Sequence, residues 1–259
     1  MLLIGGHPRS GTTLLRRLCD KHPAMCVTNE LGSFLAANKP YHAHSRHVVN
    51  RWLRVWNRWA FHSSHYEQQW IAWRNLAFVT RYVASCYRFR KELIDSHAIE
   101  AVLRSMFPAA KIVGDKWPDY VFRLDTLAAT DGVRLVIIYR DCRDVVSSTL
   151  QQVRTSWRGM PFTKQMDSAE KIAARWVRAI ELMERHRENL HIIRYESLVQ
   201  DSLVEVEALG KWLDVDPWAF PIRGIRDTSI GKHRSTLTPE ELSRVMEVAG
   251  PTMRQLNYL

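Results

Sequence analysis

The sequence predicts a three-layer α/β fold with a central parallel sheet and a large helical insertion. The chain begins with an apolar run over residues 1–6, a glycine-containing loop and a helix-forming segment over residues 11–22, which is the order of a nucleotide-binding α/β fold. Later strand-like runs alternate with segments of helical periodicity, as parallel βαβ units require. Between these two parts, residues 31–107 have a mostly helical pattern.

The elements follow in order along the chain. The run over residues 1–6 is apolar enough for a short buried strand. The insertion has Trp52, Trp56 and Trp59 at helical spacing, and we expect most tryptophans to belong to the core. After the insertion, strands are predicted over residues 110–113, 133–139 and 190–194, and helices over residues 120–129, 144–153 and 168–187.

The last part of the chain is helical again after Tyr195 and through Trp212. A basic loop that contains glycine follows over residues 224–234. Thr238 and Pro239 then predict the start of a final helix, because proline is favoured at the first helical position.

Length and composition limit the classes of protein that fit. With 259 residues, 46% of them hydrophobic, the chain can bury a large core, and we expect residues 1–259 to form a single domain. The first apolar run is too short for a signal peptide, and no stretch reaches the roughly 18 apolar residues that span a bilayer. We therefore expect a cytoplasmic protein without stable membrane insertion.

Cysteines and charge give weaker indications. The four cysteines show neither a CxxC pair nor a Cys/His cluster at zinc spacing, so we expect reduced thiols and no metal site. The formal net charge of +10 favours a polyanionic partner. Diffuse basicity alone does not separate a nucleic acid from a phosphorylated nucleotide.

The strongest motif is the loop Gly6-His-Pro-Arg-Ser-Gly-Thr-Thr13. It has the GxxxxG frame of a Walker A loop after a strand and before a helix, but Thr12 stands where the lysine belongs. Its backbone amides, its glycines and the start of the following helix favour a bound phosphate, to which Arg9, Thr12 and Thr13 add hydrogen bonds. We interpret it as a P-loop-like phosphate site, the alternative being a turn that only connects strand to helix. The missing lysine argues against ordinary hydrolysis of a magnesium nucleotide.

A second motif follows the strand predicted over residues 133–139. Arg140 leaves the carboxyl end of that strand, where ligands of open α/β sheets bind. Ser148 lies two turns into the next helix, where its hydroxyl can hydrogen-bond phosphate oxygens. The pair predicts a second phosphate site, and the alternative is a network of arginine and aspartate at a helix start.

Two phosphate sites on one sheet suggest a nucleotide phosphorylated at two ends, and with these motifs the chain resembles sulfotransferases that use 3′-phosphoadenosine 5′-phosphosulfate (PAPS). The segment Pro8-Arg-Ser-Gly-Thr-Thr-Leu14 is similar to that family's 5′-phosphosulfate loop, and Arg140 with Ser148 is similar to its 3′-phosphate site. The tyrosylprotein and bacterial branches look most similar. The resemblance implies PAPS as donor, 3′-phosphoadenosine 5′-phosphate (PAP) as product and no metal. The residues that it places in the phosphosulfate loop are Arg9, Ser10, Gly11, Thr12 and Thr13.

The same resemblance assigns roles outside the two loops. Glu30 stands at the interval after the loop arginine at which those branches carry their catalytic base. Lys116, in Gly114-Asp-Lys-Trp-Pro118, corresponds to a lysine that holds the bridging oxygen and the leaving phosphate, together with Arg9. The resemblance adds three cofactor-binding residues, which are Tyr195 beside the adenine and Ser229 and Lys232 in a loop that covers the cofactor.

The base and the acceptor are the least determined parts of this hypothesis. Cytosolic sulfotransferases use a histidine base, and no histidine here has a matching setting. The insertion over residues 31–107 matches no part of the family, so we expect it to shape the acceptor site, whether the acceptor is a small-molecule, carbohydrate or peptide hydroxyl. The alternatives to Glu30 are His42, His44, His62, His65 and His97.

Two other functions compete with a sulfotransferase. A P-loop nucleotide or small-molecule kinase would need Mg²⁺ and a lysine that reaches the β- and γ-phosphates, and Thr12 occupies the lysine position. A nucleic-acid-binding protein would spread basic and aromatic residues along one surface and would not need two phosphate loops. We therefore expect no nucleic-acid partner.

Overall fold

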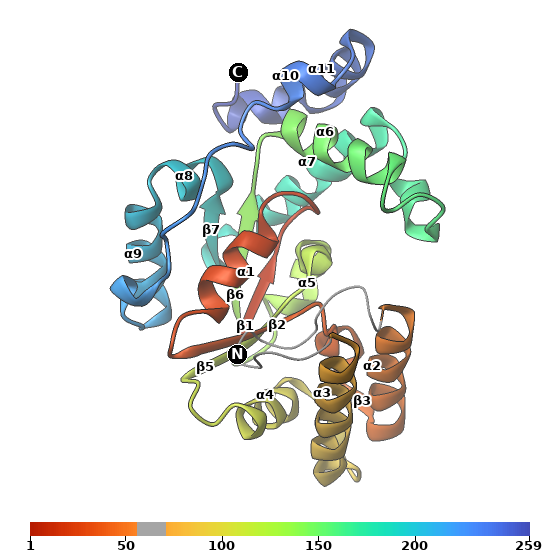
Figure 1. The fold of residues 1–259 in the computed structure, drawn as a ribbon, viewed down its shortest axis with the longest axis vertical. Helices are drawn as coiled ribbons and strands as arrows, with labels where there is room; N and C mark the ends of the chain where they lie inside the picture. Colours follow the sequence, from red (N-terminus) through yellow and green to blue (C-terminus); the bar gives the residue numbers. More distant parts are fainter. Residues whose placement is uncertain (56–70) are drawn as a thin grey trace.

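The computed structural model describes residues 1–55 and 71–259. Its centre is a sheet of five parallel strands in the order β2-β5-β1-β6-β7, with helices on both faces (Figure 1). This confirms the predicted α/β class. The strands are β1 (Leu2–Gly5), β2 (Met25–Asn29), β5 (Ile112–Lys116), β6 (Arg134–Tyr139) and β7 (Leu190–Arg194).

The central strand is the first one in the chain. Because β1 lies between β5 and β6, it is covered on both faces, which explains its continuous apolar sequence. Side chains alternate between the faces: Leu2 and Ile4 join one core cluster, and Leu3 joins the other. The loop after β1 therefore starts at the carboxyl end of the sheet, where the strand order changes direction and ligands of such sheets bind.

Helices on the two faces complete the three layers. One core cluster lies under α1 (Thr12–Asp20), α8 (Tyr195–Gln200) and α9 (Ser202–Leu213). The other lies under α6 (Cys142–Arg154), α7 (Ala169–Arg185) and α11 (Pro239–Gln255), and it continues into the insertion. The last helix begins as expected, with a capping box in which the side chains of Thr238 and Glu241 each accept a hydrogen bond from the backbone N–H of the other residue.

The sequence analysis missed strand β2. Its five residues, Met-Cys-Val-Thr-Asn, form too short an apolar run to be told from a loop. Pairing with β5, in which Cys26 faces Val113 and Thr28 faces Asp115, turns the segment into an edge strand. The predicted helix over residues 120–129 is also wrong. A 3₁₀ turn over Pro118–Arg123 and a single helical turn, α5 (Leu124–Leu127), take its place.

The insertion packs at the β5 side of the sheet and is mostly helical, as predicted (Figure 1). Helix α3 (Ile71–Cys86) contacts both α2 (Tyr41–Val55) and α4 (Ser96–Met106). An unpredicted pair of two-residue antiparallel strands, β3 (Lys39–Pro40) and β4 (Leu93–Ile94), ties its two ends together. Of the three tryptophans noted in this segment, Trp52 packs against the core, and Trp56 and Trp59 lie outside the described residues.

Two general features of the chain concern membranes and thiols. Among the described residues, none of the helices combines the length and the apolar composition that crossing a bilayer requires. All four cysteines are buried free thiols, as expected. Burial raises the pKa of Cys142 well above that of an ordinary thiol, so this cysteine at the start of α6 stays protonated.

Candidate active site

The loop between β1 and α1 has the geometry of an anion site. Gly11 precedes α1 with a φ of 100°, and a Cβ atom at this position would lie 2.5 Å from Cδ2 of Tyr195. Only glycine fits there. The start of α1 has no side-chain cap and no acidic residue in its first turn, so its free N–H groups can receive an anion.

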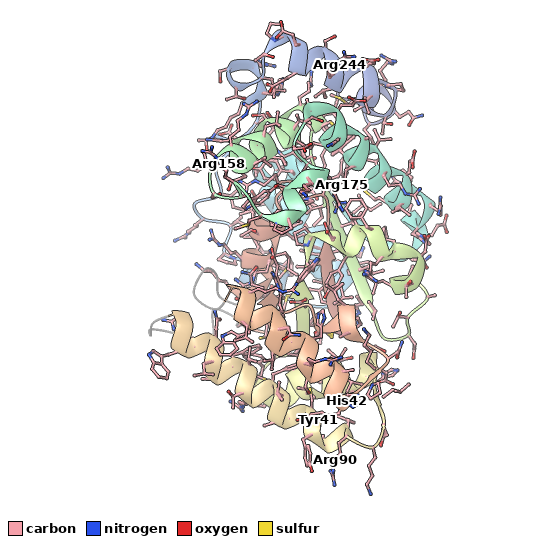
Figure 2. All side chains as sticks on the ribbon, turned by 90° about the vertical axis from the view of Figure 1, so that its right-hand side faces the viewer. Tyr41, His42, Arg90, Arg158, Arg175 and Arg244 are labelled. Atoms are coloured by element: carbon pink, nitrogen blue, oxygen red, sulfur yellow. The ribbon has the colours of Figure 1, made fainter. Side chains whose placement is uncertain are left out.

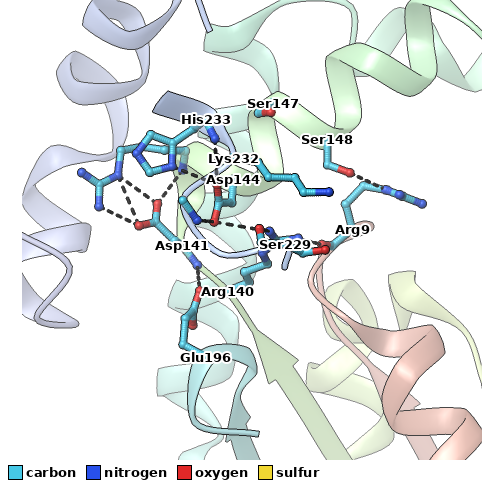
Figure 3. A network of polar contacts seen from close by, with 12 residues as sticks. Arg9, Arg140, Asp141, Asp144, Ser147, Ser148, Glu196, Ser229, Lys232 and His233 are labelled. Carbon is cyan, nitrogen blue, oxygen red and sulfur yellow. Dashed lines mark hydrogen bonds and ion pairs between the residues drawn. The ribbon is translucent and has the colours of Figure 1, made fainter. Parts of the chain in front are cut away.

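The side chains of this loop include an unpaired buried donor. The hydroxyl of Ser10 is buried and has no hydrogen-bond partner among the described residues. Thr12 is also buried, whereas Arg9 is exposed and has a positive φ of 73°. Arg9 Nε donates a 2.9 Å hydrogen bond to Ser148 Oγ on α6, so the two phosphate sites expected from the sequence meet (Figure 3).

Arg140 holds several loops together at the carboxyl end of β6. Its Nη1 donates to the Arg9 carbonyl at 3.4 Å, and its Nη2 donates to the Ser229 carbonyl. Its guanidinium carbon lies 4.6 Å from the centre of the Tyr195 ring. The remaining donor, Nε, is buried without a partner among the described residues. Arg140 thus brings together the loop after β1, Tyr195 and the loop that carries Ser229. Figure 3 shows Arg140 beside Ser229 and Arg9.

Asp144 fixes the late basic loop next to Arg140. Its carboxylate lies 3.3 Å from Arg140 Nη2 and accepts hydrogen bonds from the backbone N–H groups of Gly231 and His233. Burial raises the pKa of Asp144, but these hydrogen bonds and that of the His233 side chain lower it more, so the net shift is downward. Lys232 lies between the two anchored residues and is exposed. The ion pair of Arg140 with Asp144 is of the kind that the sequence offered as the alternative to a phosphate site, a network of arginine and aspartate at this helix start. His233 was not singled out from the sequence.

Tyr195 and Glu196 have different tasks in this arrangement. Tyr195 is buried between Gly11 and Arg140. Glu196 accepts hydrogen bonds from the Asp141 N–H at 3.0 Å and from the Tyr258 hydroxyl at 2.8 Å, so it ties the start of α6 to the end of the chain. The ring of Tyr195 thus lies at the site, and the carboxylate of Glu196 holds the start of α6 and the end of the chain in place around it.

Glu30 and Lys116 form a second cluster at the same end of the sheet. Glu30 directly follows β2, and Lys116 ends the neighbouring strand β5. Lys116 Nζ donates to Glu30 Oε1 at 2.7 Å, and the Glu30 N–H donates to the Lys116 carbonyl at 2.8 Å. The Lys116 side chain is 2% exposed and that of Glu30 is 23% exposed, so Glu30 can be reached from solvent.

Arg51 joins this cluster from helix α2 of the insertion. Its Nη2 donates to Glu30 Oε2 at 3.1 Å, and its Nε donates to the Glu30 carbonyl at 3.3 Å. The guanidinium lies 4.6 Å from the centre of the Trp117 ring. Nothing in the sequence distinguishes Arg51 from the other arginines of the insertion, and the sequence analysis missed it.

Asp115 positions the segment that carries Glu30. Its buried carboxylate accepts hydrogen bonds from the N–H groups of Leu31 and Gly32, each at 3.1 Å. It also accepts hydrogen bonds from the hydroxyls of Thr28 at 2.6 Å and Tyr120 at 2.7 Å. Burial raises the pKa of Asp115, and these four hydrogen bonds act against that increase. The positive φ of Glu30, 58°, is thus maintained by fixed neighbours on its C-terminal side.

The histidine alternatives lie in other settings. His44 is buried between the Ala36 carbonyl and the Tyr82 hydroxyl, and burial lowers its pKa. His42 lies with Tyr41 and Arg90 at the end of the insertion that is far from α11 (Figure 2). His97 is mostly exposed and lies 3.6 Å from Asp131. His62 and His65 lie outside the described residues.

The two clusters share one edge of the sheet. The Gly6 N–H donates to the Pro118 carbonyl, and the Trp117 N–H donates to the Ile4 carbonyl, each at 3.0 Å, so the phosphate loop starts beside the segment that follows Lys116. Within residues 1–55 and 71–259, no group of three or more His, Cys, Asp or Glu side chains is arranged to hold a metal ion. The edge thus combines loops that contain buried donors without a partner among the described residues, Ser10 Oγ and Arg140 Nε, with one carboxylate that two cations contact.

Comparisons with known proteins give the family and the fold of this chain. The model of the sulfotransferase family matches residues 2–219. A comparison with curated protein sequences gives no match. The fold is similar to that of the sulfotransferase domain of the olefin synthase from Synechococcus PCC 7002, with a TM-score of 0.58, 18% identity, and coverage of 97% of this chain and 94% of that one.

Two further solved structures share the fold. The sulfotransferase domain from the curacin biosynthetic pathway has a TM-score of 0.57 and 14% identity, with 95% of this chain and 96% of that chain covered. A sulfotransferase from Alicyclobacillus acidocaldarius has a TM-score of 0.53 and 16% identity, with 99% and 94% covered. At these identities the likeness concerns the fold, and the family rests on the match to residues 2–219. The chain belongs to the sulfotransferase family.

Proposed function

We propose that this protein transfers a sulfuryl group from PAPS to a hydroxyl acceptor. The observation that carries the proposal is the 2.9 Å hydrogen bond from Arg9 Nε to Ser148 Oγ, which supports two neighbouring anion sites, one at the loop after β1 and one at the start of α6. A donor with phosphate groups at both ends of a nucleoside needs two such sites at a fixed separation. Family membership supports the reaction, and the paired sites support this donor.

The chemistry of the donor set fits such a nucleotide. Each of the two sites has a buried donor without a partner among the described residues, Ser10 Oγ in one and Arg140 Nε in the other. Unsatisfied buried donors are costly, and phosphate oxygens would satisfy both. In this proposal the phosphosulfate is held by Arg9, Ser10, Gly11, Thr12 and Thr13, the 3′-phosphate by Arg140 and Ser148, and the adenine by Tyr195, under the loop with Ser229 and Lys232.

Glu30 and Lys116 perform the chemistry in this scheme. The acceptor oxygen forms a bond to sulfur while the bond from sulfur to the bridging oxygen breaks, and PAP leaves. Glu30 takes the proton of the acceptor hydroxyl, which contributes about 10² to 10⁴ in rate. Lys116 and Arg9 stabilise the negative charge that develops on the leaving oxygen. Because protein cations supply this charge, we expect activity without a divalent metal.

The first experiment compares nucleotides by calorimetry and thermal shift. PAP and ATP with Mg²⁺ are titrated into the wild type and into Arg140→Ala. We expect metal-independent binding of PAP that the substitution weakens at least about tenfold, since a charge-assisted hydrogen bond contributes about 1.5–3 kcal/mol.

Two other outcomes would contradict the proposal. A preference for ATP with Mg²⁺ would favour the kinase alternative. Failure to bind either nucleotide, with salt-dependent binding of random DNA, would favour a nucleic-acid-binding protein instead.

A further inference from the structure

Almost all of the protein's net charge lies in the first part of the insertion. Residues 31–91 contain ten Lys and Arg residues and a single acidic residue, which gives them a net charge of +9 out of +10 for the whole chain. Helices α2 and α3 contain no Asp or Glu. The rest of the chain is nearly neutral, so a general surplus of surface lysine and arginine does not explain this distribution.

Part of this charge faces the segment that carries Glu30. His47, Arg51 and Arg54 lie on one side of α2, at the spacing of successive turns. His47 Nε2 donates to the Gly32 carbonyl at 3.1 Å, and Arg51 donates to Glu30. Burial lowers the pKa of His47, and despite the opposing hydrogen bond to Gly32, the nearby cations Lys39, Arg51 and Arg54 lower it further. Positive charge therefore converges beside the carboxylate.

Both carboxylate oxygens of Glu30 have a cationic partner. Lys116 contacts Oε1 and Arg51 contacts Oε2. An acceptor hydroxyl that gives its proton to Glu30 has to approach one of these oxygens. Lys116 is 2% exposed and held in the sheet, whereas the side chain of Arg51 is 17% exposed and belongs to the insertion. Arg51 is therefore the cation that an incoming acceptor meets.

We propose that the acceptor carries an anionic group, a carboxylate or phosphate, close to the hydroxyl that is sulfated, and that Arg51 with Arg54 binds this group. The proposal rests on the sulfotransferase function and adds the substrate class. A guanidinium pairs with a carboxylate or a phosphate by two parallel hydrogen bonds. When Arg51 turns to such a group, Glu30 Oε2 becomes available to the neighbouring hydroxyl. A neutral acceptor offers Arg51 no partner to exchange for Glu30.

The test uses matched acceptors that differ in charge. With PAPS as donor, 2-hydroxyphenylacetate is compared with 2-hydroxyphenylacetamide, and N-acetylglucosamine 6-phosphate with N-acetylglucosamine. We expect kcat/KM of the wild type to favour the anionic member of at least one pair by about 10- to 100-fold, the range for charge-assisted hydrogen bonds. The pair that shows the preference identifies a carboxylate or a phosphate as the recognised group.

Arg51→Gln is the decisive variant. It should reduce this preference to about twofold or less while PAP binds as in the wild type, because Arg51 contacts the acceptor and not the nucleotide. Arg46→Gln is the matched control, since Arg46 is exposed on the same helix but lies roughly 140° around it from Arg51. The control should keep the preference.

Several results would overturn this proposal. One is equal kcat/KM of the wild type for both members of each pair. Another is an equal loss of kcat/KM for both members in Arg51→Gln. If no compound is sulfated, calorimetry with the PAP-loaded protein decides: selective binding of an anionic member, lost in Arg51→Gln, supports the proposal, and equal or absent binding overturns it. Capture by phosphatidylglycerol vesicles without discrimination within the pairs would instead assign the basic helices to a membrane surface. Failure of PAP itself to bind would count against the sulfotransferase function, so the two failures are distinguishable.

Discussion

At the scale of single residues, Glu30 depends on contacts from three directions. Lys116 and Arg51 contact its carboxylate, and its backbone N–H is bound to the Lys116 carbonyl. Asp115 holds the two residues that follow. In the proposed reaction these contacts hold the base in place before an acceptor arrives, and the contact from Arg51 is the one that an anionic group of the acceptor would replace.

Glu30→Gln tests the role of this carboxylate. Glutamine keeps the size of the side chain and can still accept the hydrogen bond from Lys116, but it does not take up a proton. We expect kcat for sulfuryl transfer to fall by about 10² to 10⁴ and the affinity for PAP to change less than about twofold. The exposed Glu92 provides the control substitution, Glu92→Gln, which should leave both unchanged. Retention of kcat in Glu30→Gln would return the role of base to a histidine.

At the scale of elements, the loop between β1 and α1 is shaped by its contact with α8. Gly11 has a positive φ and lies against the ring of Tyr195, so the conformation of the loop and the position of that ring depend on each other. Trp176 of α7 adds a hydrogen bond of 2.9 Å to the Arg140 carbonyl. Helices on opposite faces of the sheet therefore fix the loop after β1 relative to Arg140.

Gly11→Ala tests this contact. A left-handed conformation costs a non-glycine residue about 1–2 kcal/mol, and the clash of a methyl group with Tyr195 adds about 1–3 kcal/mol. We expect a loss of unfolding free energy in urea of about 2–5 kcal/mol, together with weaker binding of PAP. Gly159→Ala is the matched control, since Gly159 has a φ of 78° but a Cβ atom added there would meet no other atom within 4 Å. Equal losses in the two variants would show that the contact with Tyr195 is unimportant.

At the scale of the whole molecule, the strand order gathers residues that are distant in the chain. Glu30 and Lys116 lie on the β2–β5 side of the first strand, and Arg140 and Tyr195 lie on the β6–β7 side. The loop after β1 lies between them, so one edge of one sheet holds both clusters.

His7 links the pH dependence of stability to this edge. Burial lowers its pKa from 6.5 to about 3, despite the hydrogen bond to the Pro8 carbonyl, and Arg175 adds to the decrease. The unfolded chain thus binds a proton at His7 that the folded protein excludes. The contribution of neutral His7 to stability is therefore fully present above the pKa of His7 in the unfolded chain, and it is lost as the pH falls towards the pKa of His7 in the folded protein. Between about pH 7 and pH 5 this single group should cost about 2 kcal/mol of unfolding free energy.

His7→Gln removes this titration. Urea unfolding gives the unfolding free energy of each protein at pH 7 and at pH 5. The decrease in unfolding free energy between these two pH values should be smaller in the variant than in the wild type by about 2 kcal/mol, whatever the variant's stability at neutral pH. The same decrease in both proteins would mean that other groups, such as His44, whose pKa burial also lowers, determine the acid sensitivity.

Features encoded within a few neighbouring residues could be predicted from the sequence. The glycine-rich loop, Arg140 with Ser148, the α/β class and the helical insertion were all predicted, because strand, turn and helix signals are local. Strand β2 was missed because its five residues become a strand only through pairing with β5. Of the helix predicted over residues 120–129, only the single turn α5 forms, after the 3₁₀ turn over Pro118–Arg123.

Only the tertiary structure decided which distant side chains meet. Arg51 reaches Glu30 from the insertion, and Asp144 anchors residues 231–233 from across the site. The sequence by itself determined the class of fold and the family resemblance, since each depends on short-range order along the chain, and the phosphate-binding role of the loop after β1 stays a prediction. The pairing of cations with Glu30 depends on strand order and on how α2 packs, and no local pattern carries that information, because it arises only when separate segments are brought to one edge of the sheet.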